Sequence, residues 1–166
     1  MGMDVFGKTG NYFRRNVWGW HPLAGYIRDN FPEIAADCQY WHSNDGDGLD
    51  ADGALALADA IDAAVADGGA ARYIAERDAG LAALPNETCR QCSGSGVRTD
   101  SVGVSMKQPE RRITADGHPR QGQVGWCNGC DGRGFNRPSE THYSIDIDDL
   151  REFSAFLRES GGFEIC

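Results

Sequence analysis

Apolar residues recur with a helical period in residues 50–67. Apolar side chains fall at positions i, i+4, i+7 and i+8, on one face of a helix: Leu57, Ile61, Ala64 and Val65. Gly68-Gly69 ends this pattern, and a second helix is expected from residue 70 to residue 84, with Pro85 after it. Two helices joined by a Gly-Gly turn predict an αα-hairpin over residues 50–84.

The same period returns near the end of the chain. Residues 144–160 carry an apolar stripe made of Ile147, Leu150, Phe153, Phe156 and Leu157. Ser144 or Asp146 is the expected N-cap, and Gly161-Gly162 ends the helix. We expect this helix to pack against the αα-hairpin.

Residues 1–48 show weaker patterns. Residues 3–6 have the character of a short strand, and Pro22 suits the first turn of a helix that runs to about Asn30. Trp and Tyr can serve as contact points for a partner protein, but an Ala-rich hairpin needs bulky neighbours. We therefore expect these aromatic residues mainly in the core: Trp18, Trp20, Tyr26, Tyr40 and Trp41.

Residues 86–138 lose the helical period. Residues 97–106 alternate weakly between apolar and polar, residues 123–126 could supply a returning strand, and a polar turn region lies between them. The predicted fold class is α+β. It comprises a small helical body (residues 1–85), an inserted β-hairpin module (residues 86–138) and a C-terminal helix that packs on the body (residues 139–166).

Composition and charge narrow the classes of function. The 166 residues include 16 Lys and Arg against 25 Asp and Glu, a net charge of −9. An acidic chain is repelled by phosphate backbones and anionic membranes. Only residues 87–138 are basic, with eight bases against five acids. No apolar run is long enough to span a bilayer, and the start shows no secretory signal, so we expect a cytoplasmic protein without a membrane partner.

Four of the six cysteines belong to a repeated motif. Residues 89–96 and 127–134 both match C-x-x-C-x-G-x-G. Two C-x-x-C pairs separated by a hairpin-sized segment have the ligand spacing of a structural zinc site, and the glycines allow the chain to turn tightly around the sulfurs. Redox dithiols and an iron site are the alternatives. The motif predicts one structural Zn²⁺ held by Cys89, Cys92, Cys127 and Cys130.

A closed shell of four sulfurs leaves no position for a substrate or a reactive water, so the predicted site is structural and not catalytic. A segment of about 50 residues cannot build a sizeable apolar core, and metal binding would supply its folding free energy instead. Four thiolates and one Zn²⁺ sum to −2, which lowers the formal charge of residues 87–138 from +3 to about +1.

The two repeats resemble the cysteine-rich region of DnaJ-type co-chaperones, which strings four such repeats and binds two zinc ions. Two repeats imply one zinc ion here. The His-Pro-Asp triplet of a J domain is absent, because Leu23 follows His21-Pro22 and Arg120 follows His118-Pro119. The resemblance therefore implies a shared zinc fold without the chaperone-activating function.

The whole chain also looks like a family of actinobacterial and actinophage proteins. The features that carry this likeness are the Gly-Asn-Tyr-Phe-Arg segment near the start and the Asp-Gly-Asp-Gly-Leu loop. The resemblance supplies no activity. It implies a phage or prophage gene whose product acts on host machinery in the host cytoplasm.

Weaker candidates have simpler explanations. The aspartates at positions 45, 47, 50 and 52 alternate as in a calcium loop, but the EF-hand pattern fails in either register, which favours a capped helix start over a cation site. The four histidines are expected to be structural or on the surface. Cys38 is expected to be a small buried residue and Cys166 an exposed one.

The sequence offers no anchor for an enzyme, because it contains no P-loop, GxGxxG, HExxH or GxSxG motif. We predict a non-enzymatic zinc-binding protein that engages a protein partner. The alternative is a nucleic-acid-binding regulator that uses the basic face of the module. Arginines are the candidate contacts in either case, although a solvated face is their default interpretation: Arg111, Arg112, Arg120, Arg133 and Arg137.

Overall fold

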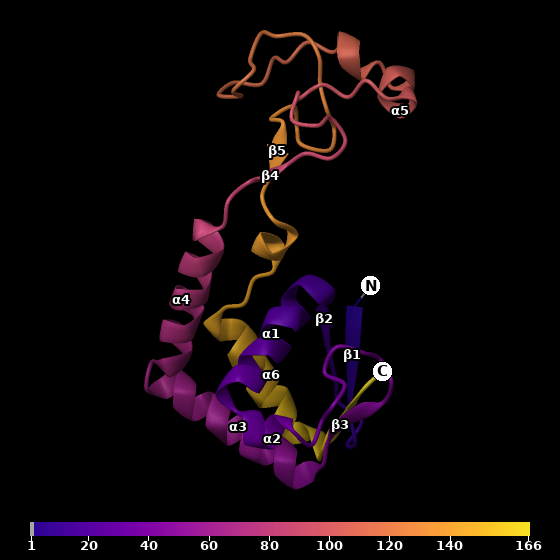
Figure 1. Cartoon of the computed structure of the whole chain (residues 1–166). Helices are drawn as coiled ribbons and strands as arrows, with labels where there is room; N and C mark the ends of the chain where they lie inside the picture. The colour runs from indigo at the N-terminus through magenta and orange to yellow at the C-terminus, as the bar shows by residue number, and fades with distance from the viewer. Residues whose placement is uncertain (1) are drawn as a thin grey trace. The chain divides into compact units, whose positions relative to one another are not determined.

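The computed structural model describes residues 2–166 and divides them into two compact units. Unit 1 comprises residues 2–82 and 140–166, and unit 2 comprises residues 83–139. Figure 1 follows the chain from one unit into the other and back. Both helices and a small antiparallel sheet are present, which confirms the expected α+β class.

Unit 1 contains an antiparallel sheet of four strands in the order β2-β1-β6-β3. The strands are β1 (Gly2–Gly7), β2 (Tyr12–Asn16), β3 (Asp47–Leu49) and β6 (Phe163–Ile165). The strand expected at residues 3–6 is present within β1. The body expected in residues 1–85 also contains three strands, because the last strand of the chain enters between β1 and β3 and completes a sheet.

The other elements of unit 1 are helices. They are α1 (Val17–Asn30), α2 (Pro32–Ala35), α3 (Ala51–Ala66), α4 (Gly69–Ala83, whose last residue lies in unit 2), η2 (Ser139–His142, which begins in unit 2) and α6 (Ile147–Ser160). Pro22 was expected in the first turn of this helix but lies in its second turn, because α1 begins at Val17. The Asn16 side chain accepts a hydrogen bond from the Gly19 N–H, and this cap starts α1 at Val17.

The core of unit 1 is largely aromatic. Phe153 of α6 is fully buried and lies 5.1 Å from the Phe13 ring and 5.8 Å from the Trp20 ring. The Trp20 indole N–H donates to the Trp41 carbonyl. Burial of the Trp20 ring therefore leaves no unpaired N–H in the core. The expectation of a core position holds for Trp20, Tyr26 and Trp41, whereas Trp18 and Tyr40 are 46% and 58% exposed.

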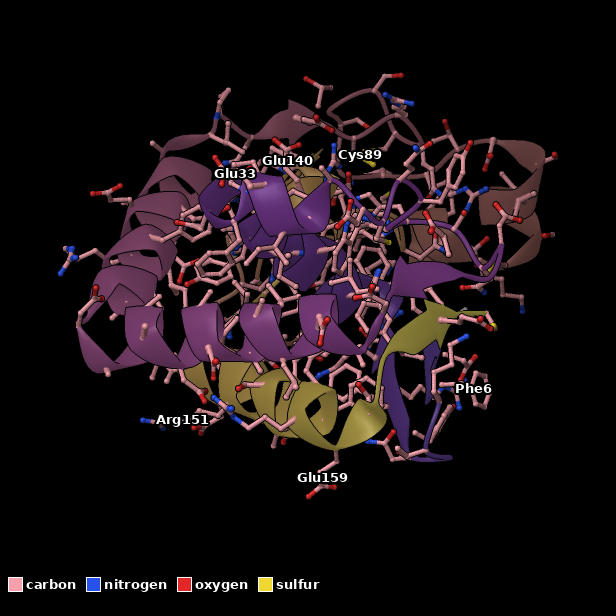
Figure 2. All side chains as sticks on the ribbon, turned by 90° about the horizontal axis from the view of Figure 1, so that it is seen from below. Phe6, Glu33, Cys89, Glu140, Arg151 and Glu159 are labelled. Atoms are coloured by element: carbon pink, nitrogen blue, oxygen red, sulfur yellow. The ribbon has the colours of Figure 1, made fainter. Side chains whose placement is uncertain are left out.

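Helix α6 packs along α3 and turns its charged side outward. Arg151 and Glu159 project away from the ribbon, as Phe6 does from the outer face of the sheet (Figure 2). At the start of α6 the side chains of Asp146 and Asp149 form a capping box, each accepting the other's backbone N–H. The cap explains why the helix begins after Asp146 and not after Ser144.

Asp146→Ala should destabilise unit 1 by about 0.5–2 kcal/mol, because the Asp149 N–H at the start of α6 loses its acceptor. Urea unfolding followed by circular dichroism measures the change. Glu159→Ala is the matched control at the other end of α6, where it should shift the free energy of unfolding by no more than about 0.5 kcal/mol. Equal effects of the two substitutions would show that the capping box contributes nothing.

Unit 2 contains little regular structure: β4 (Glu87–Thr88), α5 (Ser101–Ser105), η1 (Gln108–Glu110) and β5 (Phe135–Asn136). The expected hairpin from residues 97–106 to residues 123–126 is wrong. Asp100 caps a short helix by accepting the Gly103 N–H, so the alternation of valines lies on α5 and not on a strand. Between the two segments the Arg98 N–H donates to the Trp126 carbonyl, and Val124 forms an isolated bridge with Arg112, which lies outside the expected first strand.

Candidate metal centre

A short ladder at the base of unit 2 brings the two cysteine repeats together. Strand β4 pairs with β5 in antiparallel register, with Thr88 opposite Phe135. Cys89 follows β4 directly, and its N–H donates to the carbonyl of Gly134, the residue before β5. The ladder therefore places the start of the first repeat beside the end of the second, across a sequence separation of more than forty residues.

The four sulfurs converge. Their Sγ atoms all lie within 4.8 Å of one another, and the side chains of Cys89, Cys92, Cys127 and Cys130 are buried. Two separations across the repeats are 3.9 Å, from Cys89 to Cys127, and 3.7 Å, from Cys92 to Cys130. A tetrahedral ion with bonds of about 2.3 Å to sulfur requires sulfurs about 3.8 Å apart. A disulfide needs about 2.05 Å, so the arrangement suits one small cation and not two S–S bonds.

The glycines of the motif shape each loop around its sulfurs. The N–H of Gly96 donates to the Cys92 sulfur at 3.3 Å, and the N–H of Gly134 donates to the Cys130 sulfur at 3.2 Å. Both glycines have positive φ, 73° and 86°, which a residue with a side chain rarely adopts. These matching bonds disperse negative charge on the sulfur, as expected around a metal-bound thiolate.

Gly96→Ala should weaken metal binding by about 10–100-fold, the range found when the surroundings of metal ligands are disturbed. A Cβ at this position would overlap the Gly132 carbonyl oxygen and the Arg120 guanidinium. Gly117→Ala is the matched control, since its φ of 74° is almost the same but a Cβ there meets nothing within 4 Å. Competition with a chromophoric zinc chelator measures both variants, and equal affinities would contradict this account of the loop.

Metal binding should release protons. Burial raises the pKa of Cys130 to about 12 and raises that of Cys127. At Cys92 burial also opposes ionisation, but the Gly96 N–H and the neighbouring sulfurs outweigh it and lower the pKa to about 7. Thiols that hold protons at neutral pH must lose them to bind a cation, so the apparent metal affinity should fall as the pH falls. Zinc titration in weakly buffered solution measures the release, and its absence would contradict this assignment.

Several residues that the sequence analysis did not single out support the centre. The guanidinium of Arg98 donates to the side chains of Gln91, Asn128 and Asp100, and so links the loops of the two repeats. The buried side chain of Gln108 accepts the Asn128 N–H at 3.1 Å. No spacing rule identifies these residues, because their partners within the two repeats, Gln91 and Asn128, lie 7 to 30 positions away in the sequence.

A histidine of unit 2 has a structural position outside the sulfur cluster. The two ring nitrogens of His118 lie 2.5 Å from the Asp131 carbonyl oxygen and 3.0 Å from the Arg120 backbone nitrogen. With Nε2 as the donor and Nδ1 as the acceptor, the neutral ring satisfies both contacts. The ring thereby links the second repeat, through Asp131, to the segment before it, through Arg120. A structural histidine was one of the two expectations, the other being a histidine on the surface.

The five candidate arginines do not share one environment. Arg120 and Arg137 are half-buried and donate to backbone carbonyls, Arg120 to Gly96 and Arg137 to Leu84. Arg111, Arg112 and Arg133 are exposed. The Arg111 guanidinium lies 4.3 Å from the centroid of the Trp126 ring, and Arg133 pairs with Asp131. Arg112 also donates to a backbone carbonyl, that of Gly122, so each of the five arginines contacts another group of unit 2, and three of them are exposed.

Two aspartates of the acidic loop, residues 45–52, accept hydrogen bonds from the backbone of unit 1. The Asp47 carboxylate accepts the backbone N–H groups of Gln39, Tyr40 and Gly48, and these bonds outweigh partial burial to hold its pKa below the usual value. Asp50 caps α3. The two carboxylates are engaged with backbone N–H groups, which agrees with the capped helix start that was favoured over a cation site.

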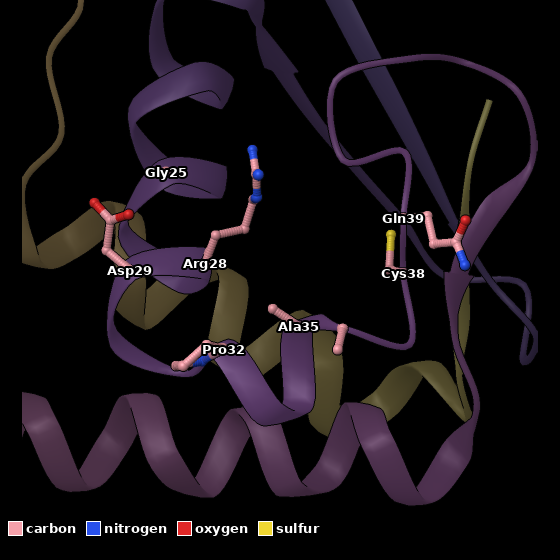
Figure 3. Close-up of a pocket in the computed structure, with 8 residues that line it drawn as sticks. Gly25, Arg28, Asp29, Pro32, Ala35, Cys38 and Gln39 are labelled. Carbon is pink, nitrogen blue, oxygen red and sulfur yellow. The ribbon is translucent and has the colours of Figure 1, made fainter.

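A cavity of about 530 Å³ opens between the end of α1, α2 and the loop after α2. Figure 3 shows the residues that line it, including Arg28, Cys38 and Gln39. Burial, followed by the charge of Asp47, raises the pKa of the Cys38 thiol to about 12, so this thiol is not a nucleophile near neutral pH. Cys38 is buried and Cys166 is exposed, as expected.

Comparisons with known proteins found no matching family model, no matching curated protein and no matching solved structure. The two resemblances noted in the sequence therefore remain predictions. Within residues 2–166, no helix combines the length and the apolar character needed to cross a membrane. The four-cysteine cluster, which could hold a metal ion, is therefore the starting point for proposing a function.

Proposed function

We propose that the four-cysteine cluster binds one structural Zn²⁺. The observation that carries the proposal is the convergence of four buried sulfurs at separations that a tetrahedral ion requires. Unit 2 also needs a source of folding free energy other than an apolar core. It buries a single large aliphatic side chain, that of Ile113. Bound metal would replace the missing core as the source of folding free energy.

Burial of the four sulfurs favours a closed metal site over a redox dithiol. All four sulfurs are buried, and the exposed fractions of Cys89, Cys92, Cys127 and Cys130 do not exceed 8%. A dithiol that exchanges with a partner needs an accessible thiolate, which these side chains do not offer. A four-sulfur zinc site is closed and has no redox chemistry, so it serves the fold and not a reaction.

Metal analysis of the protein purified under reducing conditions tests the proposal. We expect about one zinc per chain and no absorption band in the visible region. Stoichiometric iron with a thiolate-to-iron charge-transfer band would overturn the assignment. So would a reduced chain that carries no metal and takes up none when zinc is added.

We further propose that the protein is a non-enzymatic adaptor that engages a protein partner through unit 2. Support comes from large apolar side chains of this unit that are about half exposed and that a partner would cover, those of Val102, Val104, Met106 and Val124. Nucleic-acid binding is less favoured, because Arg120 and Arg137 direct their guanidinium groups to backbone carbonyls of the same unit. Affinity capture from the native cell, repeated after nuclease treatment, separates a protein partner from nucleic acid.

The likeness to the DnaJ-type region is proposed to extend no further than the folding of a zinc loop around each repeat. Between the repeats this chain carries α5 and η1, which use residues 101–105 and 108–110. The capping of α5 by Asp100 and the contacts of Gln108 are features of this segment and not of the repeats.

A further inference from the structure

The side of α1 that faces the cavity of unit 1 carries Gly25 and Arg28, which lie about one helical turn apart. Three residues of α2 and its C-terminal end also line the cavity, namely Pro32, Ala35 and Ala36. The cavity volume of about 530 Å³ lies within the range of about 300–1,000 Å³ that is usual for small-molecule sites. The cavity is therefore large enough to hold a small organic ligand.

Gly25 leaves open space at a position where a helix normally carries a side chain. It lies in the interior of α1, where glycine stabilises a helix less than alanine does. A Cβ at Gly25 would meet nothing within 4 Å, and Gly25 is not among the glycines with positive φ, so neither a close neighbour nor the backbone requires glycine here. The missing side chain instead adds room to the cavity that Gly25 lines.

Arg28 has a guanidinium group without an ion pair or a hydrogen bond in the part of the chain that the structure describes, residues 2–166. Unit 1 holds twenty acidic and eight basic residues, so carboxylates that could pair with it are plentiful. The side chain extends instead into the space between α1 and the loop that carries Cys38 and Gln39 (Figure 3). The other arginines of unit 1 all donate to a carboxylate or a carbonyl: Arg14, Arg15, Arg72, Arg77, Arg151 and Arg158.

Carboxylates near the cavity are engaged elsewhere. Asp29 also lines the cavity, but its carboxylate lies on the other side of α1 from Arg28 (Figure 3), where it accepts the Tyr73 hydroxyl at 2.7 Å. The Asp47 carboxylate, which neighbours the lining residue Cys38, accepts three backbone N–H groups. Of the two charged residues that line the cavity, Arg28 is therefore the one available to a ligand.

We propose that this cavity binds a small organic anion, whose carboxylate or phosphate group pairs with Arg28 and whose remaining atoms fill the space beside Gly25. A planar guanidinium donates two parallel hydrogen bonds to either group, which fixes the orientation of the ligand. The apolar part of the ligand would contact Pro32, Ala35 and Ala36. All of these residues belong to unit 1, so the proposal is independent of the metal centre and of the partner proposed for unit 2.

An amide-resolved NMR titration of the full zinc-loaded chain tests the proposal. The probes are benzoate and phenyl phosphate, and benzyl alcohol is a neutral control of similar size. We expect saturable shifts at residues 24–39 with at least one of the anions, and the anion that binds more tightly identifies the group that Arg28 prefers. Benzyl alcohol should bind at least about tenfold more weakly, because it lacks the charge-assisted hydrogen bonds. Equal binding of the alcohol, or no saturable shift with either anion, would overturn the proposal.

Arg28→Gln tests the charged contact. The substitution keeps a long polar side chain that suits a helix but removes the charge, and it should weaken binding of the preferred anion by at least about tenfold. Arg72→Gln is the matched control, since Arg72 is an exposed arginine of α4 that does not line the cavity, and it should leave binding unchanged. Wild-type affinity in Arg28→Gln, or equal losses in the two variants, would overturn the proposal.

Gly25→Leu tests the space in the cavity. A leucine side chain would extend into the open volume beside Gly25 and should weaken anion binding by at least about tenfold, without lowering the thermal midpoint, because leucine favours a helix more than glycine does. Gly80→Leu is the matched control: Gly80 lies in α4, a Cβ there also meets nothing within 4 Å, and binding should not change. Unaltered binding in Gly25→Leu would overturn the proposal. If Gly25→Leu does not fold, the exposed position of Arg28 makes Arg28→Gln the deciding variant.

Discussion

Replacing Cys89 by serine is expected to unfold unit 2 while leaving the helices of unit 1 in place. One ligand would be lost from a buried cluster, and metal affinity should fall by more than about 100-fold, because even disturbed neighbours of metal ligands cost up to that factor. Unit 2 has almost no apolar core to compensate, since its buried side chains are mainly the cysteines themselves. Circular dichroism and amide-resolved NMR distinguish the two units.

The helical signal should change little in this variant, because α1, α3, α4 and α6 contain nearly all helical residues and α5 contains only five. The NMR signals of residues 86–138 should lose dispersion. Cys166→Ser is the matched control, since it removes an exposed thiol outside the cluster and should preserve both metal content and dispersion. Collapse of the helical signal in Cys89→Ser would contradict the division into a metal-dependent unit and an apolar-core unit.

Phe153→Ala should have the reciprocal effect and destabilise unit 1 by about 3–5 kcal/mol. The ring is fully buried, and four aromatic rings lie around it within 6.1 Å of its centroid, those of Phe13, Trp20, Phe156 and Phe163. Their contacts join α6 to the sheet and to α1, so truncation leaves a cavity where these elements meet. This loss is a large part of the total stability that a domain normally has.

Thermal unfolding followed by circular dichroism measures the effect of Phe153→Ala, and the midpoint should fall by more than about 10 °C. The zinc content should stay near that of the wild type, because the sulfur cluster draws nothing from this core. Phe6→Ala is the matched control: its ring is 48% exposed and touches Tyr12, so its loss should cost at most about 1.5 kcal/mol. Equal midpoints for the two variants would refute the central position of Phe153.

Local signals predicted the elements that the structure confirms. The apolar stripe and the Gly-Gly stop place α6, and the stripe of Leu57 and Ile61 places α3, because a helix repeats its pattern over many neighbouring residues. The repeated C-x-x-C-x-G-x-G motif placed all four cysteines in one cluster, since each pair is local and each loop needs the same glycines.

Long-range pairing accounts for what the sequence did not predict. Strands β3 and β6 have three residues each, too few to show a period, and they pair across more than a hundred positions. Strands β4 and β5 have two residues each, which is too short for a sequence pattern. They pair next to the four-cysteine cluster. In the segment after Arg98, Val102 and Val104 are two positions apart, as in a strand. The segment is nevertheless a helix, because the Asp100 side chain caps it.

X-ray absorption at the zinc edge of the purified chain tests the central claim most directly, because it counts the atoms bound to the metal and measures their distances. The account predicts one zinc per chain surrounded by four sulfurs at about 2.3 Å. A first shell containing nitrogen or oxygen, or a chain without zinc whose sulfurs are joined in pairs at about 2.05 Å, would contradict it.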